Sequence, residues 1–472
     1  MMSSVVRDQK YDQTNLQKNS ANQTNKSSTL PMPPKHSFIT KPRLAAFLSI
    51  LFMGLGQLFN RQYVKGICFL ALELYLLIFW IVPFQWAMWG LTTLGDTPQS
   101  RDGFKIIQGD HSIFLMIEGI LFLISFLLFL WFYYLNIRDA YKVAVKSEKG
   151  IKPNNAKEMV KNIWENGFPY LLLTPSVLFT SFLTILPLLF GVLIAFTNYS
   201  APNHLPPKHL VDWVGFDTFF QLFQMKTWSS TFYGVFSWTV IWAVLSTITT
   251  FFLGLIFAVL LNQKGVKFKK FWRSIFILPW AIPQFVSILI MRNIFNGEFG
   301  PINRYLIELG IIENAIPWLS DPFWAKFTLV VVNMWFGFPF WMVLMSGVLT
   351  SIDKEVYEAA EVDGATPGQR FWKITMPLIM FATAPLAIMS FAGNFNNFNI
   401  IYLMTEGGPV NMDYTYAGST DILISWIYKL TLDNNQFAVA SVISILIFIV
   451  IATFSIINFR RTRAFKEEDM MS

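Results

Sequence analysis

The long apolar runs of this chain decide what it can fold into. Residues 437–459 carry no charged side chain, and several other apolar runs are comparably long. About 18–20 such residues are enough for a helix to cross a bilayer. Only 14% of the 472 residues are charged, whereas 54% are hydrophobic and 17% aromatic, and a soluble protein of this length needs far more charge on its surface. We therefore predict an all-α, polytopic membrane protein.

The apolar runs predict about eight transmembrane helices. They lie at about 66–83, 113–135, 168–197, 232–261, 274–295, 327–350, 377–403 and 437–459, and the seventh is interrupted by "GNFNNFN" at 393–399. The shorter run 44–59 contains two glycines and has basic residues on both sides, so we expect an interfacial or re-entrant helix there.

The same reading divides the chain into five segments. They are a disordered cytoplasmic tail (1–42), an N-terminal part with the interfacial helix and two extra spans (43–135), a cytoplasmic linker (136–167), a six-span core (168–459) and a cytoplasmic tail (460–472). About forty polar residues precede the first apolar run, so we expect no cleavable secretory leader. The single cysteine, Cys68, argues against a disulfide framework and a Cys-based metal site.

The distribution of Lys and Arg predicts the orientation. If eight spans leave both termini in the cytoplasm, the inner segments hold 28 of the 36 basic residues and the outer loops hold 7, with Arg292 near the outer end of its span. Cytoplasmic loops carry an excess of basic residues, and the opposite orientation would reverse this ratio. We therefore expect both termini and the polar segment 358–377 to face the cytoplasm.

The polar segment "EAAEVDGATPGQRFWKITMP" (358–377) lies between two spans. A helix that begins just before this segment places Tyr357, Ala360 and Glu361 on one face. Gly364 can adopt a left-handed turn without steric cost, Pro367 can open a second helix, and Pro377 marks the return to the membrane. The residues predict a short helix–turn–helix at the membrane surface, although a solvated connecting loop remains an alternative.

The spacing of this segment resembles the "EAA" loop of ABC importer permeases. Its Glu-Ala-Ala, the glycine six residues after the glutamate, Ile374 and Pro377 match the motif, and only Met376 departs from the usual leucine. In that family the loop docks in a cleft of the ATP-binding subunit and transmits ATP-driven closure to the spans. The resemblance implies that the ATPase-coupling residues are Glu358, Ala359, Ala360 and Gly364.

Several other segments resemble maltose/maltodextrin permeases of the larger, MalF-like type. They are "WVGFDTFFQLF" (213–223), "ILPWAIPQFVSILI" (277–290), "VNMWFGFPFWM" (332–342), "FAGNFNNFNI" (391–400) and "TEGGP" (405–409), within a match over about 167–463. The outer loop 198–231 lacks the large folded insert of the Gram-negative permease. The resemblance therefore implies a permease in the cell membrane of a Gram-positive bacterium.

The resemblance also implies the partners. They are a second, MalG-like permease subunit, an ATP-binding subunit dimer, an extracellular sugar-binding lipoprotein and the maltodextrin itself. No cofactor is expected on this chain, because ATP and Mg²⁺ would be bound by the partner ATPase, and no nucleic acid is expected. Accordingly, no G-x-x-x-x-G-K-[ST] phosphate loop occurs in the sequence.

Asparagines and aromatic residues within the spans suggest a sugar site. Asparagine amides offer donors and acceptors together, and polar groups at membrane depth suggest a lined cavity. Asn394 and Asn397 share one helical face, and Asn333, Phe336, Gly337 and Phe340 form a single stripe. Helix–helix hydrogen bonding with ordinary core aromatics is the alternative.

The family resemblance favours the sugar site. The matching positions that lie around the bound sugar in the maltose permease include Trp280 and Gln284 as well as Asn333, Phe336, Gly337, Asn394 and Asn397. Trp280 stands in place of a tyrosine, Gln284 in place of a serine, and Gly393 in place of a phenylalanine. These departures leave the preferred oligosaccharide length open, and a permease for another oligosaccharide remains an alternative.

Other readings have less support. His204 and His209 lie in an outer loop without a carboxylate at metal-ligand spacing, and Glu73 is expected to pair with a neighbouring helix or subunit. An ion-coupled secondary sugar transporter would show two similar halves and intramembrane acids, which the core spans nearly lack. A membrane-bound enzyme would need convergent catalytic groups, and no such motif stands out.

Overall fold

The computed structural model describes residues 40–153, 158, 161, 164–165, 167–205, 208–263 and 265–461. The chain divides into two compact units, Met1–Leu77 with Leu130–Asn166, and Ile78–Phe129 with Gly167–Ser472. Most of the predicted N-terminal tail and nearly all of the predicted C-terminal tail lie outside the described residues. The predicted segment boundaries stay predictions.

The first unit begins with two short helices where the sequence suggested a single interfacial one. α1 (Lys41–Leu51) and α2 (Leu55–Phe59) are separated by a turn at Gly54, whose φ is +91°. A Cβ atom at Gly54 would lie 2.1 Å from the Gly66 carbonyl oxygen on α3 (Tyr63–Phe79). Glycine therefore supplies both the left-handed turn and the close approach to α3.

Polar side chains tie these helices to the second half of α5 (Ser112–Glu148). The Gln57 amide donates to the Asn136 side-chain oxygen at 2.6 Å, and Lys65 pairs with Asp139 at 2.7 Å. Glu73 is buried and accepts from the Met53 N–H and, at 3.4 Å, from the Tyr133 hydroxyl. Glu73 is thus bonded within its own unit, which accounts for a carboxyl group at this depth.

In the second unit, α4 (Ile81–Thr93) follows a break at Trp80, so the run predicted as one span at 66–83 is two helices. The loop before α5 contains an antiparallel hairpin that the sequence did not suggest, β1 (Ser100–Asp102) and β2 (Lys105–Ile107), with Ser100 opposite Ile107. α5 continues to Glu148, so the first part of the predicted linker is helical.

The other regular elements of the second unit are helices. Its first helices are α7 (Phe168–Phe179), a π-helical turn (Thr180–Ile185), α8 (Leu186–Ile194), α9 (Asp217–Gln224), α10 (Lys226–Asn262), α11 (Lys269–Ala281), α12 (Gln284–Ile294) and α13 (Pro301–Glu308). They are followed by α14 (Pro322–Ser351), α15 (Lys354–Val362), α16 (Pro367–Arg370), a π-helical turn (Phe371–Thr375), α17 (Met376–Phe395), α18 (Phe398–Thr405), α19 (Leu423–Tyr428), a third π-helical turn (Lys429–Asp433) and α20 (Phe437–Arg461).

The number of spans agrees with the sequence. Among the described residues, six helices are long and apolar enough to cross a membrane, and eight spans result if each of two bent helix pairs counts as one. One such pair is α11 and α12, which bend by 92° where a single span was predicted at 274–295. Pro283 precedes α12, and a proline cannot donate the N–H that a continuous helix would need.

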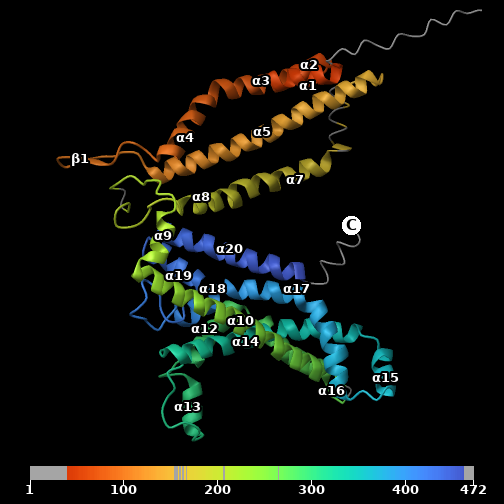
Figure 1. Ribbon diagram of the computed structural model, residues 1–472, viewed down its shortest axis with the longest axis vertical. Helices are drawn as coiled ribbons and strands as arrows, with labels where there is room; N and C mark the ends of the chain where they lie inside the picture. Colours follow the sequence, from red (N-terminus) through yellow and green to blue (C-terminus); the bar gives the residue numbers. More distant parts are fainter. Residues whose placement is uncertain are drawn as a thin grey trace, which may run out of the picture. The chain divides into compact units, whose positions relative to one another are not determined.

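The core of the second unit is built around α10 and α14, which lie side by side (Figure 1). Small residues allow the close approach, because a Cβ atom at Gly254 would lie 2.3 Å from the Trp341 Cβ atom. Figure 1 also shows α13 and α15 at opposite ends of α14. This arrangement separates α15, where the segment 358–377 begins, from α13 by the length of α14.

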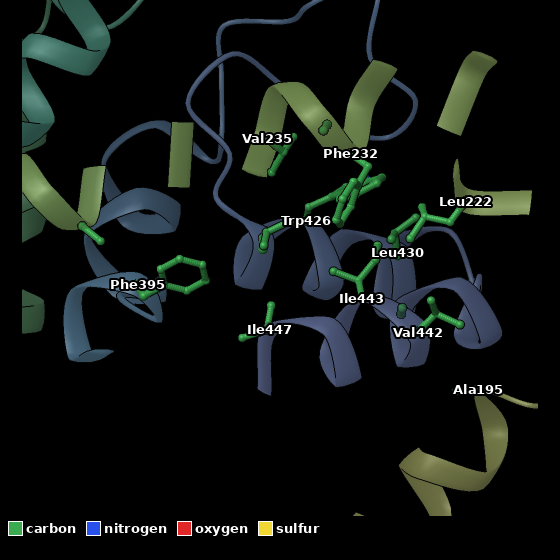
Figure 2. Close-up of a cluster of buried hydrophobic side chains, with 14 residues drawn as sticks. Ala195, Leu222, Phe232, Val235, Phe395, Trp426, Leu430, Val442, Ile443 and Ile447 are labelled. Carbon is green, nitrogen blue, oxygen red and sulfur yellow. The ribbon is translucent and has the colours of Figure 1, made fainter. Parts of the chain in front are cut away.

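A second packed region joins α10 to the last two helices of the chain. Figure 2 shows Trp426 at its centre, with Phe232 from α10 and Ile443 from α20 close by. Trp426 is fully buried, and its indole N–H donates to the Thr415 carbonyl oxygen at 3.0 Å. Its one polar atom is therefore satisfied, as burial requires.

Candidate functional site

The polar segment between α14 and α17 forms the helix–turn–helix that the sequence predicted. α15 ends at Val362, and Gly364 follows with a φ of +78°. The Gly364 N–H donates to the Glu361 carbonyl oxygen at 3.0 Å, and the Ala365 N–H donates to the Ala360 carbonyl oxygen at 2.9 Å. These two bonds form a Schellman motif, which ends a helix and reverses the chain.

A capping box opens the second helix of this segment. The Thr366 hydroxyl accepts from the Gln369 N–H at 3.3 Å, and the Gln369 side chain accepts from the Thr366 N–H at 2.9 Å. Pro367 occupies the first helical turn, as expected. From α16 the chain continues through a π-helical turn directly into α17. The second short helix is therefore joined to a long apolar helix without an intervening loop.

Two side-chain contacts fasten the two helices together. The Tyr357 hydroxyl lies 2.8 Å from the Thr375 hydroxyl, and Arg370 pairs with Glu361 at 2.8 Å. The face of α15 that carries Tyr357 and Glu361 therefore contacts α16 and the π-helical turn that follows it, with Ala360 half-buried. Of the predicted coupling residues, the other three are exposed: Glu358, Ala359 and Gly364.

The three asparagines of the predicted sugar site do come together. Asn333 on α14 is buried, accepts from the Asn397 amide at 3.2 Å and donates to the Asn394 oxygen at 3.5 Å. Asn397 lies in the break between α17 and α18, where the sequence predicted an interruption. The backbone break and the amide cluster thus occupy the same place.

Two further predicted residues have packing roles. Phe336 is 6% exposed and belongs to a buried apolar cluster with Trp242 and Ile400. A Cβ atom at Gly337 would lie 2.4 Å from a Thr250 methyl carbon, so this glycine permits the contact between α14 and α10. Packing is therefore sufficient to explain both residue types at these positions.

The remaining predicted sugar-site residues lie around the bend between α11 and α12. Trp280 is 55% exposed, and its ring meets Phe340 edge to face with a centroid distance of 5.9 Å. Gln284 is exposed at the start of α12, and in the described part of the chain its side chain makes no hydrogen bond. The side chains of Trp280 and Gln284 are thus not enclosed by the described part of this chain.

Sequence reasoning missed the α10 residues that complete the asparagine cluster. The Asn394 amide donates to the Thr247 hydroxyl at 3.1 Å and to the Ser390 hydroxyl at 3.5 Å, and the Trp242 indole donates to the Asn394 carbonyl oxygen at 3.0 Å. The run "STITT" (246–250), which places polar hydroxyls in an apolar helix, was the available signal.

Two ion pairs were not predicted from the sequence. Arg292, near the end of α12, pairs with Glu406 at 3.0 Å. Burial raises the pKa of the Asp421 carboxyl, whereas the Lys429 ammonium at 2.6 Å favours its charged form. The Asp421 Oδ2 atom also accepts from the Gly418 N–H at 2.7 Å, so two groups that can only donate converge on it.

A buried histidine in the loop before α9 has a local partner. His204 is 6% exposed, and its Nδ1 atom lies 3.1 Å from the Ser200 carbonyl oxygen. No group of three or more His, Cys, Asp or Glu residues within the described ranges is arranged to hold a metal ion. His204 is therefore best understood as part of the packed loop.

Comparisons with known proteins agree with this architecture. The family "Binding-protein-dependent transport system inner membrane component" matches residues 250–463. The maltodextrin transport system permease protein MdxF of Bacillus subtilis is 42% identical over 445 residues, which cover 93% of this chain and 100% of that protein. The galactooligosaccharides transport system permease protein GanP of the same species is 40% identical over 90% of this chain and 99% of that protein.

A more distant relative and a solved structure extend the comparison. The maltose/maltodextrin permease protein MalF of Escherichia coli is 38% identical over 55% of this chain and 51% of that protein. A bacterial ABC transporter chain from an alginate import system has a TM-score of 0.54 at 23% identity, over 65% of this chain and 99% of that one, and so shares the fold. The full-length identity to MdxF shows that this chain belongs to the inner membrane components of binding-protein-dependent transport systems, the permease subunits of ABC importers.

Proposed function

We propose that this chain is the maltodextrin permease of an ABC importer. The observation that carries the proposal is the 42% identity to a maltodextrin permease over 93% of the chain. The amide cluster of Asn333, Asn394 and Asn397 supports it, because amides offer both donors and acceptors to sugar hydroxyls. The exposed ring of Trp280 supplies an apolar wall for a pyranose face.

Open space lies beside this cluster. A Cβ atom at Gly393 would meet no atom within 4 Å, and Gly393 directly precedes Asn394. Substrate pockets combine apolar walls with a few placed polar groups, which describes this set of residues. The proposed sugar-contacting residues are Trp280, Gln284, Asn333, Asn394 and Asn397, with Phe336, Gly337 and Phe340 as their packed support.

The segment 358–377 is proposed to dock on the ATP-binding subunit. Exposed Glu358 and Ala359 can enter a cleft of a partner, while the Glu361–Arg370 pair holds the two short helices together. ATP and Mg²⁺ would be bound by a dimer of that subunit. A second permease subunit and an extracellular sugar-binding lipoprotein of a Gram-positive cell complete the proposed assembly.

Galactooligosaccharides are the second candidate substrate. The permease GanP is 40% identical to this chain over 90% of its length, only slightly below the maltodextrin relative. The test is the ATPase activity of the reconstituted complex with its binding protein, measured with maltose, longer maltodextrins and β-galactooligosaccharides. Stimulation by α-linked glucans alone supports the first proposal, and stimulation by galactosides alone replaces it with the second.

The sugar site predicts a specific defect in affinity. Asn394→Ala and Asn397→Ala each remove an amide, which is expected to raise the sugar concentration for half-maximal uptake about 2- to 13-fold. Trp280→Ala removes the apolar wall and should raise it about tenfold. Uptake is measured against sugar concentration and normalised to the assembled complex.

A matched control separates binding from packing. Trp131 is 59% exposed, close to the 55% of Trp280, and lies in the N-terminal unit, so Trp131→Ala should leave half-saturation unchanged. Asn394 also bonds Thr247, so its variant is scored for assembly as well as for affinity. Wild-type half-saturation in all three site variants would refute the site.

The orientation of the chain predicts a labelling pattern. Cys68 is the only native cysteine, and single cysteines are introduced into a Cys68→Ala background so that every labelled thiol is an introduced one. With Ser147→Cys or Lys267→Cys, a membrane-impermeant maleimide should react only after the cells are permeabilised, whereas Asn203→Cys should react in intact cells. All three positions are exposed. Reaction at residue 147 in intact cells would reverse the proposed orientation.

A further inference from the structure

A pocket of about 390 Å³ in the N-terminal unit has no role in the functions above. Its walls come from the start of α1, the end of α2 with the turn after it, and the end of α5 with the loop that follows, so three separate segments build it. Its polar and charged lining includes Lys41, Asn60, Arg61, Ser147 and Lys152. All of these lie within one unit of the chain.

The charged side chains among the described residues that line this pocket are all positive. Lys41, Arg61 and Lys152 all line it, and no carboxylate is among the described residues that do. Among the described residues, none of these three cations takes part in an ion pair, whereas nearby Lys65 is paired with Asp139. Three unpaired cations around one concavity favour an anionic ligand.

The backbone strengthens this preference. Lys41 is the first residue of α1, and the positive end of a helix dipole attracts anions. Two of the last carbonyl groups of α5 accept hydrogen bonds, because the Gly150 N–H donates to the Ser147 oxygen at 3.0 Å and the Ile151 N–H donates to the Lys146 oxygen at 3.1 Å. The negative end of α5 is thus partly neutralised where it reaches the pocket.

Arg61 is held in an unusual conformation. Its φ is +60°, a region where glycine or asparagine costs less than arginine. Its N–H donates to the Leu58 carbonyl oxygen at 2.9 Å, which fixes the turn after α2. Strained residues of this kind gather at binding sites, where the side chain is needed despite the backbone cost.

Exposed apolar side chains accompany the basic pocket. Phe59 lines it and is 43% exposed, and on α1 Phe47 and Ile50 are each 55% exposed. In a membrane these side chains would contact lipid. The distribution of Lys and Arg assigns this side to the cytoplasm, and that leaflet carries the anionic lipids.

We propose that this pocket binds a phosphate group, that of an anionic phospholipid headgroup. The phosphate would be surrounded by Lys41, Arg61 and Lys152, with Asn60 beside it. The acyl chains would lie along Phe59 and the exposed apolar residues of α1. Free inorganic phosphate has the same recognition chemistry and is separated from the lipid by the experiment.

The test counts lipids on the full chain purified in detergent. Native mass spectrometry measures retention of phosphatidylglycerol and of phosphatidylcholine with the same acyl chains. The triple variant Lys41→Gln/Arg61→Gln/Lys152→Gln should bind phosphatidylglycerol on the order of 100-fold more weakly, at about fivefold for each cation. The control triple Arg138→Gln/Lys142→Gln/Lys149→Gln removes the same charge outside the pocket and should retain the lipid.

A single variant guards against a folding artefact. Arg61→Gly removes the side chain while suiting the positive φ, so it should keep or improve thermal stability yet bind phosphatidylglycerol about fivefold more weakly. The binding of inorganic phosphate is measured by equilibrium dialysis. If phosphate binds and displaces the lipid, the site is assigned to free phosphate. If phosphatidylglycerol stays bound in the presence of phosphate, the site is assigned to the lipid. Equal lipid loss from both triples, or none from the pocket triple, overturns the proposal.

Discussion

Gly364→Pro is expected to lower sugar uptake and sugar-stimulated ATP hydrolysis together, on the order of 100-fold. Proline fixes φ near −65°, whereas Gly364 has a φ of +78°, and it removes the N–H that donates to the Glu361 carbonyl oxygen. Losing this geometry costs about 3 kcal/mol, which corresponds to about a 100-fold smaller population of the docked turn. Both rates are measured on reconstituted complexes and divided by the amount assembled.

Two alanine variants should have smaller effects on both rates than Gly364→Pro. A Cβ atom at Gly364 would meet no atom within 4 Å, so Gly364→Ala adds only backbone strain of about 1–2 kcal/mol and should lower both rates about 5- to 30-fold. Gly368 also has open space around it but lies within α16, where alanine favours the helix, so Gly368→Ala should behave as wild type. Full activity of an assembled Gly364→Pro complex would rule out the coupling role.

The features that the sequence predicted well are set by short-range chemistry. The turn at Gly364 and the second helix at Pro367 follow from capping bonds within six residues of each other. The break at "GNFNNFN" was visible for a similar reason, because asparagines there offer the backbone alternatives to helical bonds. The span number followed from hydropathy alone.

The features that escaped prediction depend on residues far apart in the chain. The Trp238 indole donates to the carbonyl oxygen of Thr420, 182 positions further along the chain, at 3.0 Å. No local sequence pattern predicts such a bond. The same limit applies to the candidate sugar site. Asn333 and Asn394 were assigned to one site and are in contact, but the sequence could not show that Phe336 lies inside a packed core while Trp280 is exposed.

Asp421→Asn is expected to destabilise the core unit strongly. The Asp421 side chain is fully buried, and its carboxylate meets Lys429 at 2.6 Å, Ser425 at 2.7 Å and the Gly418 N–H at 2.7 Å. Removing one partner of a buried ion pair costs about 3–5 kcal/mol, because the remaining charge is left uncompensated. The midpoint of thermal unfolding, followed by size-exclusion chromatography of a fluorescent fusion, should fall on the order of 5–10 °C.

The double variant Asp421→Asn/Lys429→Met tests the cause. It removes both charges, so it should recover most of the stability that the single variant loses. The exposed pair of Arg304 and Glu308 is the control, because Glu308→Gln breaks a salt bridge in water and should change the unfolding midpoint little. Gly407 packs directly on the Asp421 carboxylate, because a Cβ atom at Gly407 would lie 2.0 Å from the Asp421 Oδ1 atom. If the double variant is as unstable as Asp421→Asn alone, then the hydrogen bonds to Gly418 and Ser425, and not the charge of Lys429, hold the loop before α19 on the core.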